Sequence, residues 1–533
     1  MSVTSKTLFT LGFSEGKEFG EALKLVKTLE ASGLDDDAVI QALTELQLAK
    51  PQPLEMTAPK EVAIAMQAET PEECDNLNKV LSTMSRLSQS PVISGIAVMP
   101  DACPAGGDDA AITVGGAIAV ENAIVPYSTS ADLCCSMHAT FFQLQDHSQL
   151  SIANLMDSLQ ASTRFGAGGR KPHELVYHEV IDENVWNNPF LSGLQSYAKV
   201  HMADQGDGNH FAYLGVINPK VMSGKLSAAG YDELAVKLSK VDQCFVFVTH
   251  HGSRGLGAQV YKRGLAAAVG YTAKVAKNIP KAAAWLDFNT KEGQDYWDAL
   301  QYVSRWTLAN HQSIHTLFLQ QIKGQKVADF GNQHNFCWVK PTPDNNGTPQ
   351  IGKPNIFLHG KGATPAWKDQ IGRPLLGLIP LNMASNILIV LGANNEKYLS
   401  FAPHGAGRNL SRSQVTKGFK DDQGEVLTTA VKKSIEQQTK GLDIRWFNGT
   451  PDISESPLGY KNADSIKKAI STFKLAEVIG EIRPLGCIMA GSAPIYRGKR
   501  QSRKELRKIS TRAERRNAKQ HIMDDLLESE DDQ

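Results

Sequence analysis

The chain of 533 residues has room for two to four average domains, or for one large body with appendages. Hydrophobic residues make up 41% of it and charged residues 21%, which is enough for a real core and ordinary for a soluble protein. The formal net charge of zero identifies no class of partner, because the charge is unevenly spread.

Cysteine usage and apolar runs predict the compartment. The seven cysteines, an odd number, are scattered without small-domain spacing, which argues against a disulfide framework and for a reducing environment. No run of about 18 apolar residues occurs, and no long apolar stretch follows Met1. We therefore expect neither a membrane span nor a secretory signal, and predict a cytoplasmic protein.

Residues 1–53 are predicted to form a helical lead-in. Apolar residues such as Leu25, Val26 and Leu29 follow helical spacing within 15–48, and Gly33 breaks the pattern before it restarts. The prolines at 51 and 53 end the segment. Because amphipathic stripes are usually core faces, we interpret this part as a packed accessory hairpin and not as a catalytic element.

Residues 54–494 mix short β-branched runs with helical patterns. The runs predict strands at 92–98, 112–120, 244–249, 355–358 and 387–391. The helical patterns lie at 71–88, 255–278, 291–322 and 422–439. Several of the strands are followed at once by Gly, His and Asn clusters, which is where functional sites tend to lie.

Residues 495–533 are predicted to be a tail that is first basic and then acidic. Residues 497–519 carry eleven Lys or Arg against two Glu, and residues 524–532 hold six acidic residues. Basic runs attract phosphates without sequence preference, so contact with RNA and a merely solvated tail are both open. The acidic end could also fold back and screen the basic part.

Four short segments each place a histidine or cysteine beside small or polar residues. They are residues 130–137, 206–211, 249–257 and 333–336. Asp, Cys and His are what a borderline divalent transition ion accepts, and a thiolate can bridge two ions. None of the segments has zinc-finger spacing, so spacing alone predicts only a possible metal site.

Glycine-rich segments with basic residues predict oxyanion binding. In residues 401–412, His404 precedes two glycines and two arginines, and residues 359–364 and 252–255 offer similar combinations. Glycine lets backbone N–H groups approach a phosphate, and arginine grips it with two hydrogen bonds. A histidine beside bound phosphate can serve as nucleophile as well as base. A tight structural turn remains the alternative for each segment.

Taken in order, these motifs resemble the RtcB RNA ligase family from about residue 90 to 491. The segments that carry the resemblance are Met99-Pro100-Asp101, Asp132 with Cys135, Gly208-Asn209-His210-Phe211, His250 with Gly252-Ser253-Arg254-Gly255, His334-Asn335, Lys361-Gly362-Ala363-Thr364 and His404-Gly405-Ala406-Gly407-Arg408. The resemblance implies an α+β fold, with one large catalytic domain over 54–494, strands around a dinuclear metal site and helices outside.

The resemblance also implies an RNA ligase that depends on two Mn²⁺ ions and GTP. His404 would attack the α-phosphate of GTP to give a histidine–GMP phosphoramidate, and Asp101 would orient His404. GMP would pass to an RNA 3′-phosphate, after opening of any 2′,3′-cyclic phosphate, and a 5′-hydroxyl would then displace it. Such a protein would act in RNA repair or splicing.

The expected binding residues follow from the same resemblance. Cys135 would bridge the two ions, whose shells would be completed by Asp132, His210, His250 and His334. The nucleotide would be bound by Asn209, His334, Asn335, Asn382, Ser385, His404, Gly405, Ala406 and Gly407. RNA or nucleotide phosphates would be held by Arg254, Lys361, Arg408 and Arg412.

The sequence departs from the family pattern mainly around the nucleotide. Tyr213 stands where the family has a glutamate thought to read guanine, and Met489 stands where it has a lysine that contacts the nucleotide. Residues 381–384 differ from the family's Gly-Ser-Met-Gly. Outside this shell, Cys103 replaces a family histidine, and Cys134 and Ser136 replace family glycines. Either other residues read guanine, or the chain uses another nucleotide or substrate.

Two alternatives to a ligase stay open from the sequence. The altered nucleotide shell is also consistent with a metal-dependent phosphoesterase that opens RNA cyclic phosphates without joining ends. A non-catalytic RNA-binding protein that uses the basic tail is the other alternative. The retained Asp, Cys and His ligands and His404 argue against it, because a protein that only binds RNA does not require this combination of residues.

Overall fold

The computed structural model describes residues 3–13, 16–48, 53–105, 108, 110–145, 151–166, 168–421, 423–424 and 426–492. The predicted basic and acidic tail, 495–533, lies outside the described residues. The described residues fall into two compact units. An N-terminal unit contains those of 1–55 with 274–277, and the remainder form the main unit.

The N-terminal unit consists of three helices, α1 (Ser5–Thr10), α2 (Lys17–Ala31) and α3 (Asp36–Leu48). Leu8, Val26, Val39 and Leu43 are among the buried residues of its own small core. The predicted break falls between α2 and α3, where Gly33 has a φ of +85° that favours glycine. The periodicity of the lead-in therefore corresponds to a core face of this unit.

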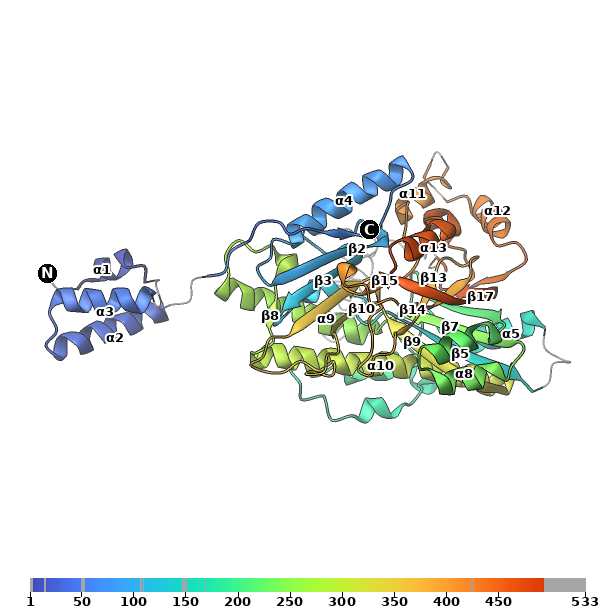
Figure 1. Ribbon diagram of the computed structural model, residues 1–533, viewed down its shortest axis with the longest axis horizontal. Coiled ribbons are helices and arrows are strands. Elements are labelled where there is room, and N and C mark those ends of the chain that lie inside the picture. Colours follow the sequence, from blue (N-terminus) through green and yellow to red (C-terminus); the bar gives the residue numbers. More distant parts are fainter. Residues whose placement is uncertain are drawn as a thin grey trace, which may run out of the picture. The chain divides into compact units, whose positions relative to one another are not determined.

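The main unit is built on two sheets (Figure 1). The five-stranded sheet has the order β1 (Ala63–Ile64), β2 (Ile93–Cys103), β3 (Val114–Glu121), β11 (Ile356–Lys361) and β10 (Asn335–Val339). The eight-stranded sheet has the order β13 (Leu376–Pro380), β14 (Ile387–Gly392), β17 (Ala476–Met489), β6 (Phe211–Ile217), β7 (Cys244–His251), β5 (Ser136–Leu144) and β9 (Gly324–Gln333), with β16 (Asp443–Trp446) paired to β17.

Two short pairs of strands complete the β-structure of the described residues. The pair β12 (Ala363–Pro365) and β15 (Phe401–Pro403) is antiparallel and leads directly into the segment that starts at His404. The pair β4 (Ala123–Ile124) and β8 (Leu286–Asp287) is also antiparallel.

Helices lie along both sheets. They are α4 (Pro71–Leu87), α5 (Ile152–Ser162), α6 (Gln195–Val200), α7 (Lys220–Ala228), α8 (Asp232–Ser239), α9 (Arg254–Val275), α10 (Lys291–Ile322), α11 (Arg412–Lys417), α12 (Thr428–Gln438) and α13 (Ala463–Thr472). Figure 1 shows α4 beside β2 and the long α10 along β5 and β9, and these elements are in contact. The buried Phe318 of α10 packs edge-on against Phe142 of β5 and Phe247 of β7.

The α+β architecture is therefore as predicted, with helices outside the strands. All five predicted strands begin within two residues of the observed ones, but β2 continues to Cys103, well beyond the predicted end at 98, and β11 continues to Lys361, beyond the predicted end at 358. The helix predicted at 422–439 starts later, at Thr428. Lys420 and Val426 form an isolated bridge around Gly424, whose φ is +82°, so this part of the chain turns before the helix begins.

Among the described residues, no helix combines the length and apolar character needed to cross a bilayer.

Candidate functional site

Four neighbouring strands bring candidate metal ligands to one edge of the eight-stranded sheet. The strands β6, β7, β5 and β9 are adjacent and successively antiparallel, so β5 and β6 begin where β7 and β9 end. Cys135 directly precedes β5 and His210 directly precedes β6. His250 lies at the end of β7 and His334 follows β9. Residues nearly 200 positions apart in the sequence therefore meet at one place.

The ligand atoms of these residues form two groups that share one sulfur. Cys135, His250 and His334 make one group, and Asp132, Cys135 and His210 make the other, with the ligand atoms of each group within 4.8 Å of one another. Cys135 Sγ is 3.1 Å from His250 Nε2, and His250 Nε2 is 3.2 Å from His334 Nε2. His210 Nε2 is 2.9 Å from Asp132 Oδ2 and 3.6 Å from Cys135 Sγ.

The chemistry of these groups fits a pair of divalent cations. Burial, and then neighbouring imidazoles, lower the pKa of both His250 and His334, so these rings are neutral and have a lone pair to offer. Burial, and then the Asp132 carboxylate, raise the pKa of Cys135, so its thiol keeps its proton in the absence of a cation. A divalent cation reverses this balance by stabilising the thiolate. One thiolate between two sets of ligands is the arrangement of a bridging cysteine.

Backbone and amide hydrogen bonds fix the two ligand-bearing loops against each other. The Cys134 N–H donates to the Asn335 carbonyl at 2.8 Å, and the His334 N–H donates to the Cys135 carbonyl at 2.9 Å. The Asn335 side chain donates to the Asp132 carbonyl at 3.2 Å and accepts from the Gly362 N–H at 2.7 Å. Asn335 therefore positions Asp132 as well as lining the cavity described below.

Gly252 permits the close approach of Asp132. A Cβ atom at Gly252 would lie 1.9 Å from Asp132 Oδ1, so a larger residue would displace the carboxylate from its group.

His404 lies beside this cluster and is oriented by a buried carboxylate. His404 Nδ1 is 2.6 Å from Asp101 Oδ2, and the same oxygen accepts from the His404 N–H at 3.0 Å and the Gly405 N–H at 3.2 Å. Asp101 is fully buried at the end of β2. Because Nδ1 is used by this hydrogen bond, Nε2 is the ring nitrogen with a lone pair for chemistry.

The imidazole of His404 is close to the ligand cluster. Its ring centroid lies 4.9 Å from that of His334. Gly362, at φ +63°, passes next to the ring, and a Cβ atom there would lie 2.9 Å from His404 Nδ1 and Cε1. The loop between β11 and β12 therefore needs glycine to let the histidine reach this position.

Two arginines that follow His404 in the chain converge on one buried glutamate. Arg412 Nε donates to Glu455 Oε1 at 2.7 Å, and the Tyr460 hydroxyl donates to Glu455 Oε2 at 2.8 Å. Arg408 Nη1 lies 3.8 Å from Glu455 Oε2, and its Nη2 donates to the Ser454 carbonyl at 2.7 Å. Burial alone would raise the pKa of Glu455, but Arg412 and Arg408 outweigh it and lower that pKa. The cationic groups are thereby held in place beside His404.

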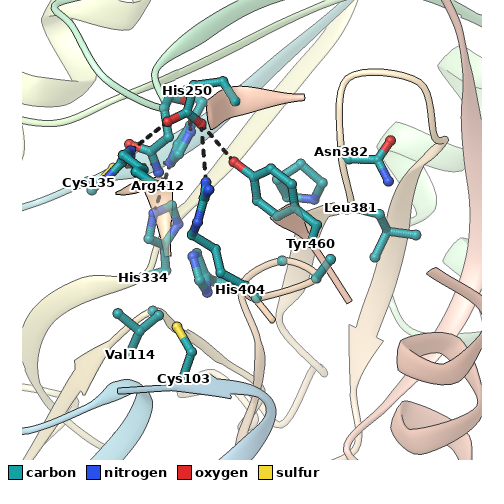
Figure 2. Close-up of a pocket in the computed structure, with 18 of the residues that line it drawn as sticks. Cys103, Val114, Cys135, His250, His334, Leu381, Asn382, His404, Arg412 and Tyr460 are labelled. Atoms are coloured by element: carbon teal, nitrogen blue, oxygen red, sulfur yellow. Dashed lines mark hydrogen bonds and ion pairs between the residues drawn. The ribbon is translucent and has the colours of Figure 1, made fainter. Parts of the chain in front are cut away.

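Most of these groups line one cavity of about 580 Å³. Figure 2 shows Cys135, His250 and His334 on one side of it and Leu381 and Asn382 on the other, with His404 and Tyr460 between. The predicted binding residues that line it are Asp132, Cys135, Asn209, His250, His334, Asn335, Lys361, Asn382, His404, Gly405, Ala406, Gly407, Arg408 and Arg412.

Four predicted site residues lie outside that lining. Asp101 and His210 are buried behind it, hydrogen-bonded to His404 and Asp132. Ser385 lies next to the cavity-lining Asn382, to whose carbonyl its N–H donates at 3.1 Å. Arg254 is buried at the start of α9, where its guanidinium packs against Gly206. Its predicted contact with phosphate stays a prediction.

Three residues at the site were not predicted from the sequence. Glu455 and Tyr460 hold the arginines in place. The buried Lys461 donates from Nζ to the carbonyls of Pro100 and Ala102, the residues before and after Asp101, at 3.0 and 2.7 Å. The short 3-10 helices η6 (Ile453–Glu455) and η7 (Pro457–Gly459) position them. Their local sequence has no glycine-rich or ligand-like pattern, so only the three-dimensional contacts identify them.

Comparison with known proteins gives one consistent result. A family model described as tRNA-splicing ligase RtcB matches residues 190–490, more than half of the chain. The tRNA-splicing ligase RtcB of Pyrococcus furiosus is 26% identical over 311 residues, and the match covers 53% of this chain and 29% of that protein. The RNA-splicing ligase RtcB of Escherichia coli is 24% identical over 444 residues, which cover 78% of this chain and 95% of that protein. The chain thus spans less than a third of the Pyrococcus relative and nearly all of the E. coli one.

Proposed function

Because the chain belongs to the RtcB family, we propose that it is an RNA ligase that joins 3′-phosphate or 2′,3′-cyclic phosphate ends to 5′-hydroxyl ends. The reaction proceeds through a covalent nucleotide on His404, for which the family resemblance predicts GTP as the donor. One observation carries this proposal: the His404 imidazole, oriented by buried Asp101, lies in the same cavity as the clusters that share Cys135.

His404 is suited to be the nucleophile. Asp101 accepts a hydrogen bond from the Nδ1–H group, which fixes the tautomer and leaves the Nε2 lone pair for attack on the α-phosphorus. The new N–P bond forms as the bond from the α-phosphorus to the bridging oxygen breaks, and pyrophosphate leaves. Asp101 also stabilises the positive charge that develops on the ring during attack.

The cations and the basic side chains would neutralise the negative charge of the nucleotide and RNA phosphates. Two divalent ions, Mn²⁺ in this proposal, would be held by Cys135, His250 and His334 and by Asp132, Cys135 and His210, and when bound would neutralise the triphosphate. Lys361, Arg408 and Arg412 line the cavity and supply further positive charge for phosphates of the nucleotide or RNA.

The later steps use the same cavity. The 3′-phosphate of the RNA attacks the phosphorus on His404, and the N–P bond breaks to give an activated RNA end. The 5′-hydroxyl then attacks that RNA phosphate, and the nucleoside monophosphate leaves with its bonding electrons. A 2′,3′-cyclic phosphate is first opened by water.

The proposal is tested by the intact mass of the protein after incubation with Mn²⁺ and each of the four nucleoside triphosphates. We expect a covalent nucleotide adduct that is absent from His404→Ala and retained in the control His173→Ala, a largely exposed histidine. An adduct that persists in His404→Ala, or no adduct with any nucleotide, would contradict the proposal. With cyclic-phosphate RNA, release of 3′-phosphate ends without joined product would instead favour the phosphoesterase.

A further inference from the structure

One wall of the cavity is formed by the paired strands β6 and β17. Phe211 is opposite Met489 and Tyr213 is opposite Cys487 in the register of these antiparallel strands. Alternate residues of a strand point to the same face of a sheet, so the four side chains share one face, and all four line the cavity. We call this set of four residues the base wall.

The surroundings of the base wall are also apolar. Leu381, Met383 and Ile387 line the cavity beside it, and all three are buried. Methionine and aromatic side chains offer polarizable surface on which a planar base can stack. This end of the cavity therefore favours a flat, weakly polar group.

The polar atoms of the base wall have little to offer a hydrogen-bonding base. The Tyr213 hydroxyl donates to the Ile482 carbonyl at 3.0 Å, so its proton is already used. Burial raises the pKa of Cys487 to about 12, which keeps it a neutral thiol and a weak hydrogen-bonding group.

No carboxylate of the described cavity lining faces this wall. The two lining carboxylates are Asp132, which contacts His210, and Glu455, which binds Arg412 and Tyr460. Guanine presents an N1–H and an amino group side by side, and a pocket that selects it needs an acceptor for both. An apolar wall leaves these donors unpaired, so it gives guanine no advantage over adenine.

The position of the cavity's other groups places a base near this wall. The cation ligands and His404 define where the triphosphate reacts, and Leu381 and Asn382 lie on the opposite side of the cavity from Cys135 and His334 (Figure 2). A nucleoside attached to a phosphorus at His404 and directed away from Cys135 and His334 extends toward Leu381 and Asn382, which line the same cavity as the base wall.

We propose that the base wall binds a purine by stacking and burial without selecting guanine, so that His404 takes AMP from ATP about as readily as GMP from GTP. This inference rests on the proposed function, because it specifies the nucleotide donor of the same reaction.

The decisive experiment is a comparison of ATP and GTP as donors to the wild-type chain. The rate of adduct formation on His404 is measured by intact mass with Mn²⁺ and each nucleotide alone, and then with both at equal concentration. We expect the two rates to agree within about 10-fold, or ATP to be faster, because no paired acceptor distinguishes the bases. A preference for GTP of more than about 10-fold overturns the inference while leaving the ligase proposal standing. Absence of every adduct overturns the ligase proposal itself.

A matched pair of variants tests the place of the base. Tyr213→Glu introduces a carboxylate into the base wall, and Tyr213→Gln introduces a side chain of the same length that cannot accept both guanine donors. We expect the ratio of GTP to ATP rates to be at least about 10-fold higher in Tyr213→Glu than in Tyr213→Gln. Equal ratios in two variants that melt like the wild type would show that the base lies elsewhere. The wild-type comparison decides the inference if either variant fails to fold.

Discussion

Asp101 illustrates how one buried oxygen can organise a reactive side chain. Its Oδ2 accepts from the His404 ring and from two successive backbone N–H groups, while Lys461 holds the carbonyls on either side of it. Three donors around one oxygen need an atom that only accepts, and a carboxylate oxygen is such an atom. The position of His404 thus depends on the charge state of Asp101 as well as on its shape.

We therefore expect Asp101→Asn to form the His404 adduct about 100- to 10,000-fold more slowly than the wild type. If the asparagine placed its NH₂ group at the position of Oδ2, that group would face three N–H donors. If it placed its oxygen there, the neutral amide would stabilise the developing imidazolium less well than the carboxylate does. Adduct formation is followed by intact mass. Bound Mn²⁺ per chain should stay unchanged, because Asp101 belongs to neither ligand group. An adduct rate within a factor of two or so of the wild type would refute the role of Asp101.

The adjacent cysteines 134 and 135 provide a controlled test of the metal cluster. Cys135 Sγ belongs to both ligand groups, whereas Cys134 belongs to neither and its thiol is hydrogen-bonded to Thr307. We expect Cys135→Ser to lose tight binding of both Mn²⁺ ions, because a serine hydroxyl is a much poorer bridging ligand than a thiolate. Cys134→Ser should bind as the wild type does. Metal content after gel filtration distinguishes them, and equal content in both variants would contradict a bridging Cys135.

At the scale of elements, the segment after β15 is held from several sides. Asn409 donates from its side chain to Glu73 of α4 at 3.1 Å and from its N–H to the Gly459 carbonyl at 2.9 Å. The Lys461 N–H donates to the Gly407 carbonyl at 3.0 Å. The glycine-rich segment is thus fixed between α4 and the η6–η7 region, which keeps His404 and the two arginines together.

Glu455 carries the negative charge that pairs with Arg408 and Arg412 in that arrangement. Its replacement should lower the free energy of unfolding by an amount that depends on pH. Its lowered pKa means that its ion pairs stabilise the folded state above the ordinary glutamate pKa of 4.5, and that this stabilisation is lost as the pH falls through the folded value. We expect Glu455→Gln to lower the free energy of unfolding by about 2–4 kcal/mol at neutral pH, because Arg412 is left without its carboxylate.

The difference between this variant and the wild type should shrink below about pH 4.5, and denaturant unfolding at neutral and acid pH measures it. A difference that is the same at both pH values would assign the destabilisation to packing and not to the ion pairs.

Periodicity predicted the elements that carry a clear apolar signal. The helices α4 and α10 and the strand β7 lie close to where the residue pattern predicts them. The long β17 was not predicted, since Glu477, Glu481 and Arg483 interrupt its apolar residues. Its partners β6 and β14 lie far away in the sequence, and pairing with them stabilises charged residues in a strand that local propensity does not reveal.

The sequence predicted only some residues of the candidate site, for a similar reason. The histidines, Cys135 and Asp132 occur in motifs that resemble a family, and the structure brings them to one sheet edge. Glu455 contacts Arg412, 43 positions away, and Lys461 contacts Pro100, 361 positions away, so no local pattern contains these contacts. Tyr460 bonds to Glu455 itself. Two departures from the family pattern also find partners only in the fold: Ser136 Oγ lies 2.9 Å from His311 Nε2, and Cys134, at φ +61°, bonds to Thr307.

At the scale of the whole molecule, the uneven distribution of charge predicts that the tail affects RNA binding but not nucleotide chemistry. The last described residue, Ser492, donates from its N–H to the Thr450 carbonyl at 3.0 Å, so a chain that ends there keeps the contacts made among the described residues. Residues 497–519, with eleven basic residues against two glutamates, lie beyond it. Removing residues 493–533 should therefore leave the adduct rate on His404 unchanged.

The same truncation should weaken RNA binding in a salt-dependent way. Basic residues that neutralise phosphates release counterions, so their loss lowers affinity most at low salt and makes the dependence of affinity on salt shallower. We expect RNA affinity to fall by about 10-fold or more at low salt and to change little at high salt. A second chain that lacks only residues 520–533 keeps the basic residues and loses the acidic end, so it should bind RNA at least as tightly as the full chain. Fluorescence anisotropy at two salt concentrations compares the three chains, and equal affinities throughout would mean that the main unit alone supplies the RNA-binding surface.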